Sequence, residues 1–217
     1  LEDVRDIVGL GGTILGTSRT NPVKSEDSLK KVIENYEKLE LSGLIVIGGD
    51  DTIGAGYALS KHGLNIVGVP KTIDNDLSGT DVTFGFDTAI NLATEAIDRL
   101  MTTAKSHERV FVIELMGRHA GWITAEVGIA VGADIILLPE RPFRFEDVIS
   151  QLKKIRQSGR NYAIMAVSEG ARLAITDNNG SLVFKDLEKD EYGHVRLGGI
   201  AAKLAEEIED QIDWEAR

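Results

Sequence analysis

Short runs of apolar, mostly β-branched residues recur along the chain and predict buried strands. These runs are Leu44–Ile47, Ile66–Val69, Val110–Ile113, Ile135–Leu138 and Tyr162–Val167. The apolar residues are nearly continuous rather than alternating, which is typical of strands that are buried on both faces of a parallel sheet. We therefore expect covering layers on both sides of such a sheet.

The stretches between the runs carry apolar residues at helical spacing and predict helices. These stretches are Ser25–Leu39, Ile53–Ser60, Phe86–Ala104, His119–Val131, Phe145–Arg156 and Gly199–Ile212. Strands that alternate with helices require crossover connections, so the pattern predicts an α/β fold with three layers and mostly parallel, Rossmann-like sheets. Residues 175–195 depart from the pattern: a turn signal at Asp177–Gly180 predicts a surface hairpin there.

Composition and charge exclude several classes of protein. The chain has 217 residues, of which 42% are hydrophobic and 27% charged, so it can bury a core. Its formal net charge of −11 argues against binding to nucleic acid and against binding to an anionic membrane surface. No apolar run approaches the roughly 18 residues of a membrane span. The absence of cysteine excludes thiolate chemistry and favours a cytoplasmic location.

A loop rich in glycine and carboxylates, Gly48-Gly49-Asp50-Asp51-Thr52, follows the first apolar run and precedes a predicted helix. Two glycines let the backbone approach a ligand closely, and the helix N-terminus favours a phosphate group. The two carboxylates have two interpretations: they hold Mg²⁺ together with a substrate phosphate, or one of them caps the helix.

A second polar loop follows the next apolar run and contains Lys71, Thr72, Asp74 and Asp76. We expect it to open at the same edge of the sheet, where converging carboxylates would raise one another's pKa values. A metal ion together with Lys71 would relieve that repulsion, and one carboxylate could then act as a general base toward a hydroxyl group. The alternative is a polar turn in which Asn and Asp only cap the backbone.

Further candidates follow the later apolar runs. Gly117 permits a close approach and Arg118 offers a planar fork for phosphate, while Glu169 can accept hydrogen bonds from sugar hydroxyls. Arg109 stands before its run, near the opposite edge of the sheet, where it could serve the site of a neighbouring subunit. Either arginine could instead form a surface salt bridge. Arg19 offers another contact for an anion.

Taken together, these motifs resemble the phosphofructokinase family. The shared segments are Gly-Gly-Thr-Ile-Leu-Gly-Thr-Ser-Arg at 11–19, Gly-Gly-Asp-Asp, Pro-Lys-Thr-Ile-Asp-Asn-Asp, Ser-His-Glu-Arg at 106–109, Met-Gly-Arg and Ser-Glu-Gly. The resemblance covers nearly the whole chain. It implies Mg²⁺-dependent transfer of a phosphoryl group to the 1-hydroxyl of fructose 6-phosphate, in glycolysis and gluconeogenesis.

The resemblance also implies roles for individual residues. Asp74 would be the general base, Thr72 and Asp76 would position sugar and metal, and Asp50 would bind Mg²⁺. The substrate-binding set implied by the family is Thr72, Asp74, Asp76, Arg109, Met116, Gly117, Arg118, Glu169 and Arg217. The donor-binding set is Arg19, Gly49, Asp50, Asp51 and Thr52. Arg109 would reach the substrate of an adjacent subunit, which implies a homodimer or homotetramer.

The identity of the phosphoryl donor depends on two positions. ATP-dependent members typically have glycine where this chain has Asp51, because a carboxylate there would repel the α-phosphate of a nucleotide. Members with this aspartate, and with lysine at the position of Lys71, are similar to the pyrophosphate-dependent enzymes. In those enzymes the lysine would stabilise the transferring group. We therefore expect pyrophosphate as the donor and a reaction that runs in both directions.

The resemblance implies two lobes and a longer polypeptide. Residues 1–86 would belong to the lobe that binds the donor, and residues 87–217 to the lobe that binds the sugar phosphate. The family's first strand with its phosphate loop would precede Leu1, and a further substrate-binding segment would follow Arg217. We therefore expect the chain to be incomplete at both ends and inactive or poorly folded when expressed alone.

Three alternatives remain at this point. The first is an ATP-dependent 6-phosphofructokinase that tolerates Asp51, and donor specificity would identify it. The second is a non-catalytic paralogue that binds sugar phosphate without turnover, which substitution of Asp74 would separate from an enzyme. The third is a Mg²⁺-binding α/β protein that acts on another phosphosugar.

Overall fold

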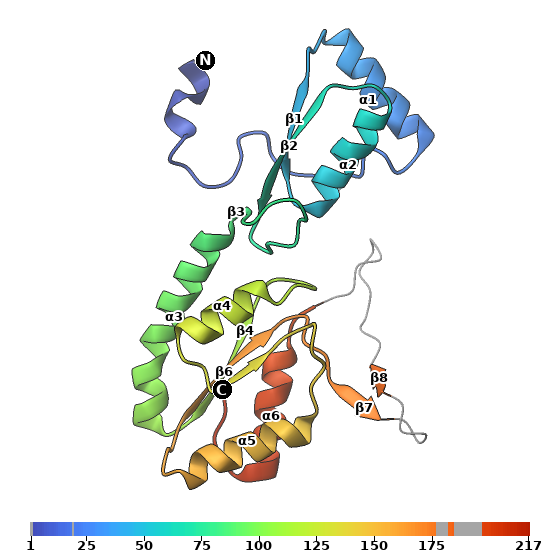
Figure 1. The fold of residues 1–217 in the computed structure, drawn as a ribbon. Helices are drawn as coiled ribbons and strands as arrows, with labels where there is room; N and C mark the ends of the chain where they lie inside the picture. The colour runs from blue at the N-terminus through green and yellow to red at the C-terminus, as the bar shows by residue number, and fades with distance from the viewer. Residues whose placement is uncertain (1, 19, 177–181, 185–196) are drawn as a thin grey trace. The chain divides into compact units, whose positions relative to one another are not determined.

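The computed structural model describes residues 2–18, 20–176, 182–184 and 197–217 (Figure 1). The chain forms two compact units, Leu1–Val69 and Pro70–Arg217. Residues 70–86 therefore pack with the second unit. The expected border near Phe86 concerns ligand-binding lobes, and it stays a prediction.

The first unit contains a small parallel α/β layer. Its described elements are η1 (a 3-10 helix, Glu2–Ile7), α1 (Glu26–Lys38), β1 (Leu44–Gly48), α2 (Asp50–Lys61) and β2 (Ile66–Thr72), the last of which continues into the second unit. Helix α1 begins after Ser25, whose side chain accepts a hydrogen bond from the Ser28 N–H. Helix α2 packs closely on the strands at Gly56, where a Cβ would lie 2.7 Å from Val46.

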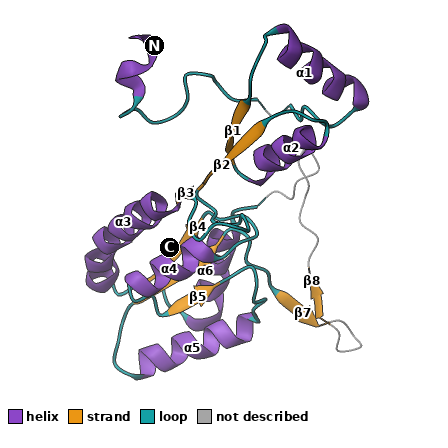
Figure 2. Cartoon of the chain, turned by 45° about the horizontal axis from the view of Figure 1, so that its top comes forward, coloured by secondary structure: helices purple, strands orange, loops and turns teal. Residues whose placement is uncertain are grey.

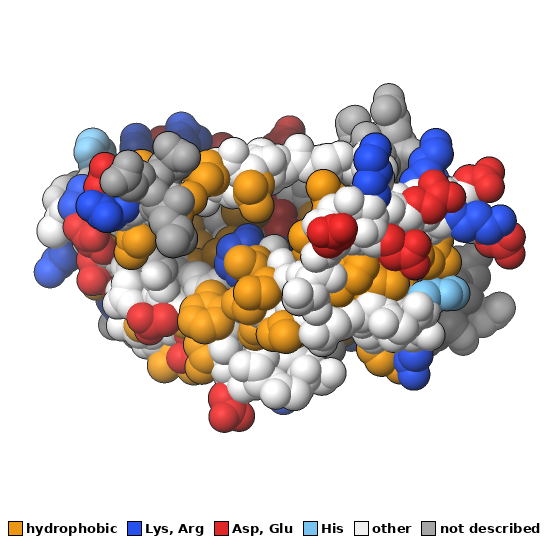
Figure 3. All heavy atoms as spheres, turned by 90° about the horizontal axis from the view of Figure 1, so that it is seen from above, with side chains coloured by type: hydrophobic (Ala, Val, Ile, Leu, Met, Phe, Trp, Pro, Cys, Tyr) orange, Lys and Arg blue, Asp and Glu red, His pale blue; other side chains and the backbone are white. Residues whose placement is uncertain are grey.

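Several apolar side chains of the first unit are exposed. Ile45 and Ile47 alternate with inward residues along β1, and Val67 on β2 is also more than half exposed. Figure 3 shows hydrophobic side chains reaching the surface on the face seen from above. Strands of parallel sheets are normally covered on both faces, whereas the described residues of the first unit leave one face of these strands without a covering layer.

The second unit is a three-layer α/β sandwich (Figure 2). Its described elements are β3 (Phe84–Gly85), α3 (Phe86–His107), β4 (Val110–Leu115), α4 (Trp122–Ala130), β5 (Ile135–Leu137), α5 (Phe145–Gln157), β6 (Ala163–Ser168), β7 (Ala174–Thr176), β8 (Leu182–Phe184) and α6 (Ile200–Ile212). The strands β4, β6 and β5 are parallel in that order.

The central strand β6 is buried at every position, which explains its continuous apolar sequence. Met165 and Val167 pack on one face with α5 and α6, while Ile164 and Ala166 pack on the other with α3 and α4. Two hydrophobic layers therefore hold the sheet in place. Within the described ranges, no helix is long and apolar enough to cross a membrane.

The chain after α6 adds an edge to this sheet that the sequence pattern did not predict. Ala216 pairs with Val110 in parallel orientation. The Val110 N–H donates to the Glu215 carbonyl at 2.9 Å, and the Val112 N–H donates to the Arg217 carbonyl at 2.7 Å. Trp214 is 4% exposed and belongs to the same hydrophobic layer as α5 and α6.

The predicted α/β class is confirmed, and each predicted strand and helix is present. Several boundaries were wrong. β2 continues through Thr72, β4 continues to Leu115, α2 begins at Asp50, and α4 begins only at Trp122. Strands β7 and β8 pair antiparallel, as expected for a hairpin, whereas its predicted turn lies outside the described residues.

Candidate active site

The first unit presents the loop with two carboxylates at the start of α2. Gly49 is the N-cap residue and supplies no side-chain cap, so Asp50 and Asp51 lie in the first turn of the helix. Both are exposed. Thr52 folds back against Gly48, where a Cβ would lie 2.6 Å from the Thr52 side chain. The capping alternative for the two aspartates is therefore wrong, because neither occupies the cap position.

The donor set of this loop is compatible with Mg²⁺. Within the described ranges, no group of three or more His, Cys, Asp or Glu side chains could hold a metal ion by itself. Mg²⁺ usually retains several waters and binds through one or two carboxylates plus the phosphates of a substrate. Asp50 and Asp51 offer oxygen ligands of that kind in adjacent positions, so a metal shared with a phosphate fits them.

The second unit begins with the polar segment that contains Asp74. Lys71 and Thr72 belong to the end of β2 rather than to a loop, and Lys71 is exposed. The Asp74 N–H donates to Thr72 Oγ1 at 3.1 Å. Asp74 and Thr72 are partly buried, while Asp76 is exposed. The chain therefore turns back on itself directly after the strand and holds the Asp74 backbone against Thr72.

The surroundings of Asp74 raise the pKa of its carboxyl group above the ordinary value of 3.8. Burial is the largest cause, followed by the negative charge of Asp76, and Glu169 adds a smaller effect in the same direction. The Thr72 hydroxyl and the charge of Arg118 act in the opposite direction but are outweighed. A carboxylate whose pKa is raised accepts a proton more readily, as a general base requires.

Two residues without an assigned role in the sequence pattern fix the loop around Asp74. Asn75 has a φ of 52°, in the left-handed region that Asn tolerates better than most residues. The buried Thr83 donates from its N–H to Asn75 Oδ1 at 2.9 Å and from its hydroxyl to the Thr72 carbonyl at 2.7 Å. Strand β3, which follows Thr83, then pairs with the end of β2.

The segment after β4 forms a tight turn that Glu169 holds in place. Gly117 has a φ of 140° and Arg118 a φ of 53°. The Glu169 Oε1 atom accepts hydrogen bonds from the Gly117 N–H at 3.2 Å and from the Arg118 N–H at 2.9 Å. Met116, at the start of the turn, is exposed. The structure therefore brings together residues 116–118 and 169, which the sequence placed at the ends of two different strands.

Neighbouring loops lock this turn further. A Cβ on Gly170 would lie 1.9 Å from the Arg118 carbonyl oxygen, so the two backbones are in direct contact. The Gly121 N–H, at the start of α4, donates to Glu140 Oε1 at 2.7 Å. Arg172 donates to the Pro139 carbonyl at 3.2 Å. The loops that follow β4, β5 and β6 are thus joined by hydrogen bonds and backbone contacts. Glu140 takes part in these contacts, and the sequence pattern did not identify it.

Arg109 and Arg217 lie at the sheet edge formed by the tail of the chain. The Arg109 Nε atom lies 2.6 Å from Glu215 Oε2 in an ion pair. The Arg109 guanidinium beside it holds the pKa of the Glu215 carboxyl below its ordinary value. Arg217 pairs with Glu209 at 2.8 Å and with Glu215 at 2.7 Å. The salt-bridge alternative therefore describes Arg109 within this chain, and its role toward a neighbouring subunit stays a prediction. Arg19 lies outside the described residues.

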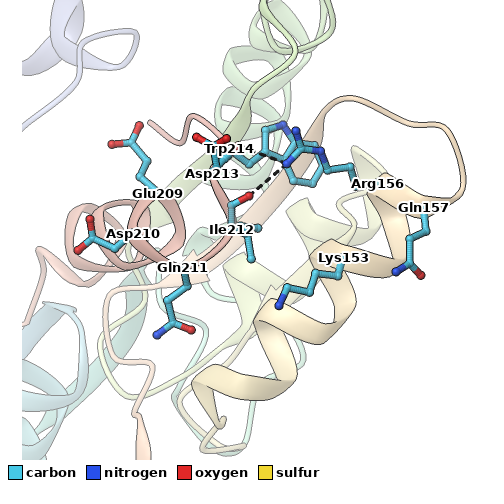
Figure 4. A pocket seen from close by; sticks show the side chains of 9 residues that line it. All are labelled: Lys153, Arg156, Gln157, Glu209, Asp210, Gln211, Ile212, Asp213 and Trp214. Atoms are coloured by element: carbon cyan, nitrogen blue, oxygen red, sulfur yellow. Dashed lines mark hydrogen bonds between the residues drawn. The ribbon is translucent and has the colours of Figure 1, made fainter.

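A surface hollow of about 800 Å³ lies between α5 and the end of α6 (Figure 4). Arg156 donates to the carbonyl groups of Ile212 and Asp213 at 3.1 and 3.2 Å, and its guanidinium lies 5.5 Å from the centre of the Trp214 ring. These contacts cap the C-terminus of α6. None of the predicted site residues lines this hollow.

Comparisons with known proteins agree with the motifs. The family model described as Phosphofructokinase matches residues 1–217. A pyrophosphate–fructose 6-phosphate 1-phosphotransferase of Dictyoglomus thermophilum is 50% identical over 218 residues, which cover 100% of this chain and 62% of the relative. An enzyme of Streptomyces coelicolor named ATP-dependent 6-phosphofructokinase 3 is 46% identical, with coverage of 100% and 62%.

A solved structure supports the same relationship. The pyrophosphate-dependent phosphofructokinase from Marinobacter aquaeolei has a TM-score of 0.72 at 26% identity, covering 94% of this chain and 49% of that one. The expected fold is thereby confirmed. The chain spans 62% of the length of the curated relatives described above.

Proposed function

Because this chain belongs to the phosphofructokinase family, we propose that the polypeptide containing it transfers a phosphoryl group from pyrophosphate to the 1-hydroxyl of fructose 6-phosphate. The observation that carries the proposal is the partly buried Asp74 carboxylate, whose pKa is raised and whose backbone is fixed against Thr72. Since the chain spans 62% of its relatives, the activity is proposed for the longer polypeptide.

The acceptor side of the reaction is assigned to the second unit. The Asp74 carboxylate takes the proton of the 1-hydroxyl while the hydroxyl oxygen of the sugar attacks a phosphorus atom of pyrophosphate. A new P–O bond forms to the sugar, the bridging P–O bond of pyrophosphate breaks, and inorganic phosphate leaves. Arg118 supplies positive charge for the 6-phosphate of the sugar. Glu169 orients the Arg118 turn through Oε1, and its carboxylate also accepts hydrogen bonds from the sugar hydroxyls.

The donor side rests on Asp51 and Lys71. Asp51, exposed in the first turn of α2, places a negative charge where the α-phosphate of ATP would lie by analogy with the family. Pyrophosphate has only two phosphate groups, so it has no group at the position of the α-phosphate that Asp51 would repel. Lys71 is exposed at the end of β2, and its ammonium group neutralises charge on the transferring group. The bond broken in pyrophosphate and the ester formed are close in free energy, so the reaction is reversible.

Mg²⁺ is proposed as the metal that the Asp50 carboxylate holds together with a phosphate of the donor. When bound, it supplies positive charge that offsets the charge developing on the phosphoryl oxygens. Asp50 provides one oxygen ligand, in line with the preference of Mg²⁺ for few protein ligands.

A second candidate is the same transfer with ATP as donor. It is favoured by the relative of Streptomyces coelicolor, which is 46% identical and named ATP-dependent. The two candidates share the acceptor chemistry and differ only in the phosphoryl donor, for which Asp51 and Lys71 are the proposed determinants. A homodimer or homotetramer, in which Arg109 reaches a neighbouring site, and a cytoplasmic location are part of the proposal in both cases.

The deciding experiment compares the two donors in the longer polypeptide with Mg²⁺ and fructose 6-phosphate. Release of inorganic phosphate from pyrophosphate, coupled to formation of fructose 1,6-bisphosphate, is the expected result. Turnover with ATP alone would reject pyrophosphate and leave the acceptor chemistry in place. Binding of fructose 6-phosphate without turnover of either donor would instead identify a non-catalytic paralogue.

A further inference from the structure

One buried residue closes the loop that carries Asp74. Thr83 is 2% exposed. Its hydroxyl donates to the Thr72 carbonyl at 2.7 Å, and its N–H donates to Asn75 Oδ1 at 2.9 Å. Thr72 and Asn75 stand on either side of Asp74 in the chain. Thr83 therefore ties down both ends of the short segment that contains the proposed general base.

These contacts are unusual for a buried threonine. A threonine hydroxyl commonly bonds to a carbonyl of its own helix or turn, a few residues away. Here the acceptor lies eleven positions earlier, at the end of β2. The strand pairs Lys71–Phe84 and Thr72–Gly85 continue the closure immediately after Thr83. The hydroxyl therefore closes a loop and does not cap a local turn. We call the contacts of Thr83 with Thr72 and Asn75 the clasp.

Asn75 completes the closure. Its φ of 52° turns the backbone directly after Asp74. Its Oδ1 atom accepts from Thr83, and its Nδ2 atom donates to the Asp81 carbonyl at 3.4 Å. The side chain thus bridges the two arms of the loop, while the Asp74 N–H is held by Thr72 Oγ1 at 3.1 Å. Asp74 is left with little backbone freedom.

We propose that Thr83 is a positioning residue of the phosphoryl-transfer reaction, because its hydroxyl and N–H hold Thr72 and Asn75 so that the Asp74 carboxylate keeps its place. This inference rests on the function proposed above. A general base must stand within hydrogen-bonding reach of the proton that it takes, and a displacement of about 1 Å can reduce the rate about 100-fold. Thr83 acts on the reaction only through its two neighbours.

The test uses the longer polypeptide with two matched substitutions. Thr83→Val keeps the shape of the side chain but removes the hydroxyl donor, whereas Thr83→Ser keeps the donor. We expect Thr83→Val to lower kcat by about 10- to 100-fold, with a smaller change in KM for fructose 6-phosphate, because the proposed contacts Arg118 and Glu169 are untouched. Thr83→Ser should restore most of kcat. Equal kcat values for the two variants, or a loss in KM alone, would overturn the proposal.

A second measurement separates the clasp from catalysis and applies even where Thr83→Val does not fold. Asn75→Gly retains the positive φ but removes the amide oxygen. The Thr83 amide should exchange slowly with solvent deuterium in the wild type and rapidly in Asn75→Gly. If the wild type is active but its Thr83 amide exchanges as fast as that of Asn75→Gly, the clasp is rejected and the proposed function is retained. A slowly exchanging amide in a polypeptide that turns over neither donor would reject the proposed function and leave the clasp in place.

Discussion

Substitution of Gly170 by alanine tests how rigidly the Arg118 turn must be held. A Cβ at this position would lie 1.9 Å from the Arg118 carbonyl oxygen, and 3.4 Å from Pro139 Cγ. A real Cβ essentially never lies closer than 3.0 Å to such an atom, so the two backbones must separate by about 1.1 Å. The obstructing atom belongs to the backbone, and no side-chain rotation can relieve the contact.

The displacement has two measurable consequences. It pulls the Gly117 and Arg118 N–H groups away from Glu169 Oε1, to which they now donate at 3.2 and 2.9 Å. Overpacking of this kind costs about 1–3 kcal/mol of folding free energy. Because Arg118 is the proposed contact for the sugar phosphate, KM for fructose 6-phosphate should rise by about 10- to 100-fold. The assay is a set of initial rates in the longer polypeptide together with a thermal melt.

The matched control is Gly54→Ala. Gly54 lies within α2, and among the described residues no atom beyond the nearby backbone of the helix itself lies within 4 Å of the position of a new Cβ, so alanine fits there. Alanine should even stabilise the helix by about 1 kcal/mol. If Gly170→Ala binds fructose 6-phosphate as tightly as the Gly54→Ala control, the Arg118 turn is not the sugar-phosphate contact.

Three further predictions concern single groups. Asp74→Asn should lower kcat by about 100- to 10,000-fold. The pKa of Asp74 is raised, so ionisation of its carboxyl group lowers the stability of the folded protein as pH rises above 3.8. Asp74→Asn should therefore also melt at a higher temperature than the wild type near pH 7, but not below pH 3.8. Equal melting temperatures near pH 7 would contradict the pKa shift. Asp51→Gly should raise kcat/KM for ATP relative to pyrophosphate by at least about tenfold, or about 1.4 kcal/mol, and an unchanged ratio would exclude Asp51 as the determinant. Trp214→Phe removes the donor to the Glu108 carbonyl at 2.7 Å and should cost about 1–3 kcal/mol in a denaturant titration, while KM stays constant.

The strands and helices could be predicted because burial leaves a direct trace in the sequence. β6 is apolar at almost every position since both of its faces are covered. The strand ends were missed where polar side chains continue the backbone pairing, as at Lys71 and Thr72, which pair with Phe84 and Gly85. Backbone hydrogen bonds do not depend on the polarity of the side chain, so hydropathy could not locate these ends.

The candidate site was predicted in part because parallel strands bring their carboxyl ends together. Gly117 and Arg118 follow one predicted strand and Glu169 follows another, and the resemblance to the family assigned all three to one substrate. The structure joins them by hydrogen bonds. Thr83 and Glu140 were not found, because a single threonine or glutamate in a loop carries no periodicity or motif that reveals its partner. Their roles come from contacts across the fold, which only the three-dimensional arrangement supplies.

The pairing of the chain's tail, at Ala216, with Val110 at the edge of the sheet has a consequence for synthesis of the chain on the ribosome. Trp214 follows its hydrogen-bonding partner Glu108 by 106 positions. At about 5–20 residues per second, roughly 5–20 s separate the appearance of the two residues. During that interval the N–H groups of Val110 and Val112 have no tail to pair with, and an uncovered edge invites association with other nascent chains. A pause in translation before Trp214 would prolong this exposure and the need for a chaperone.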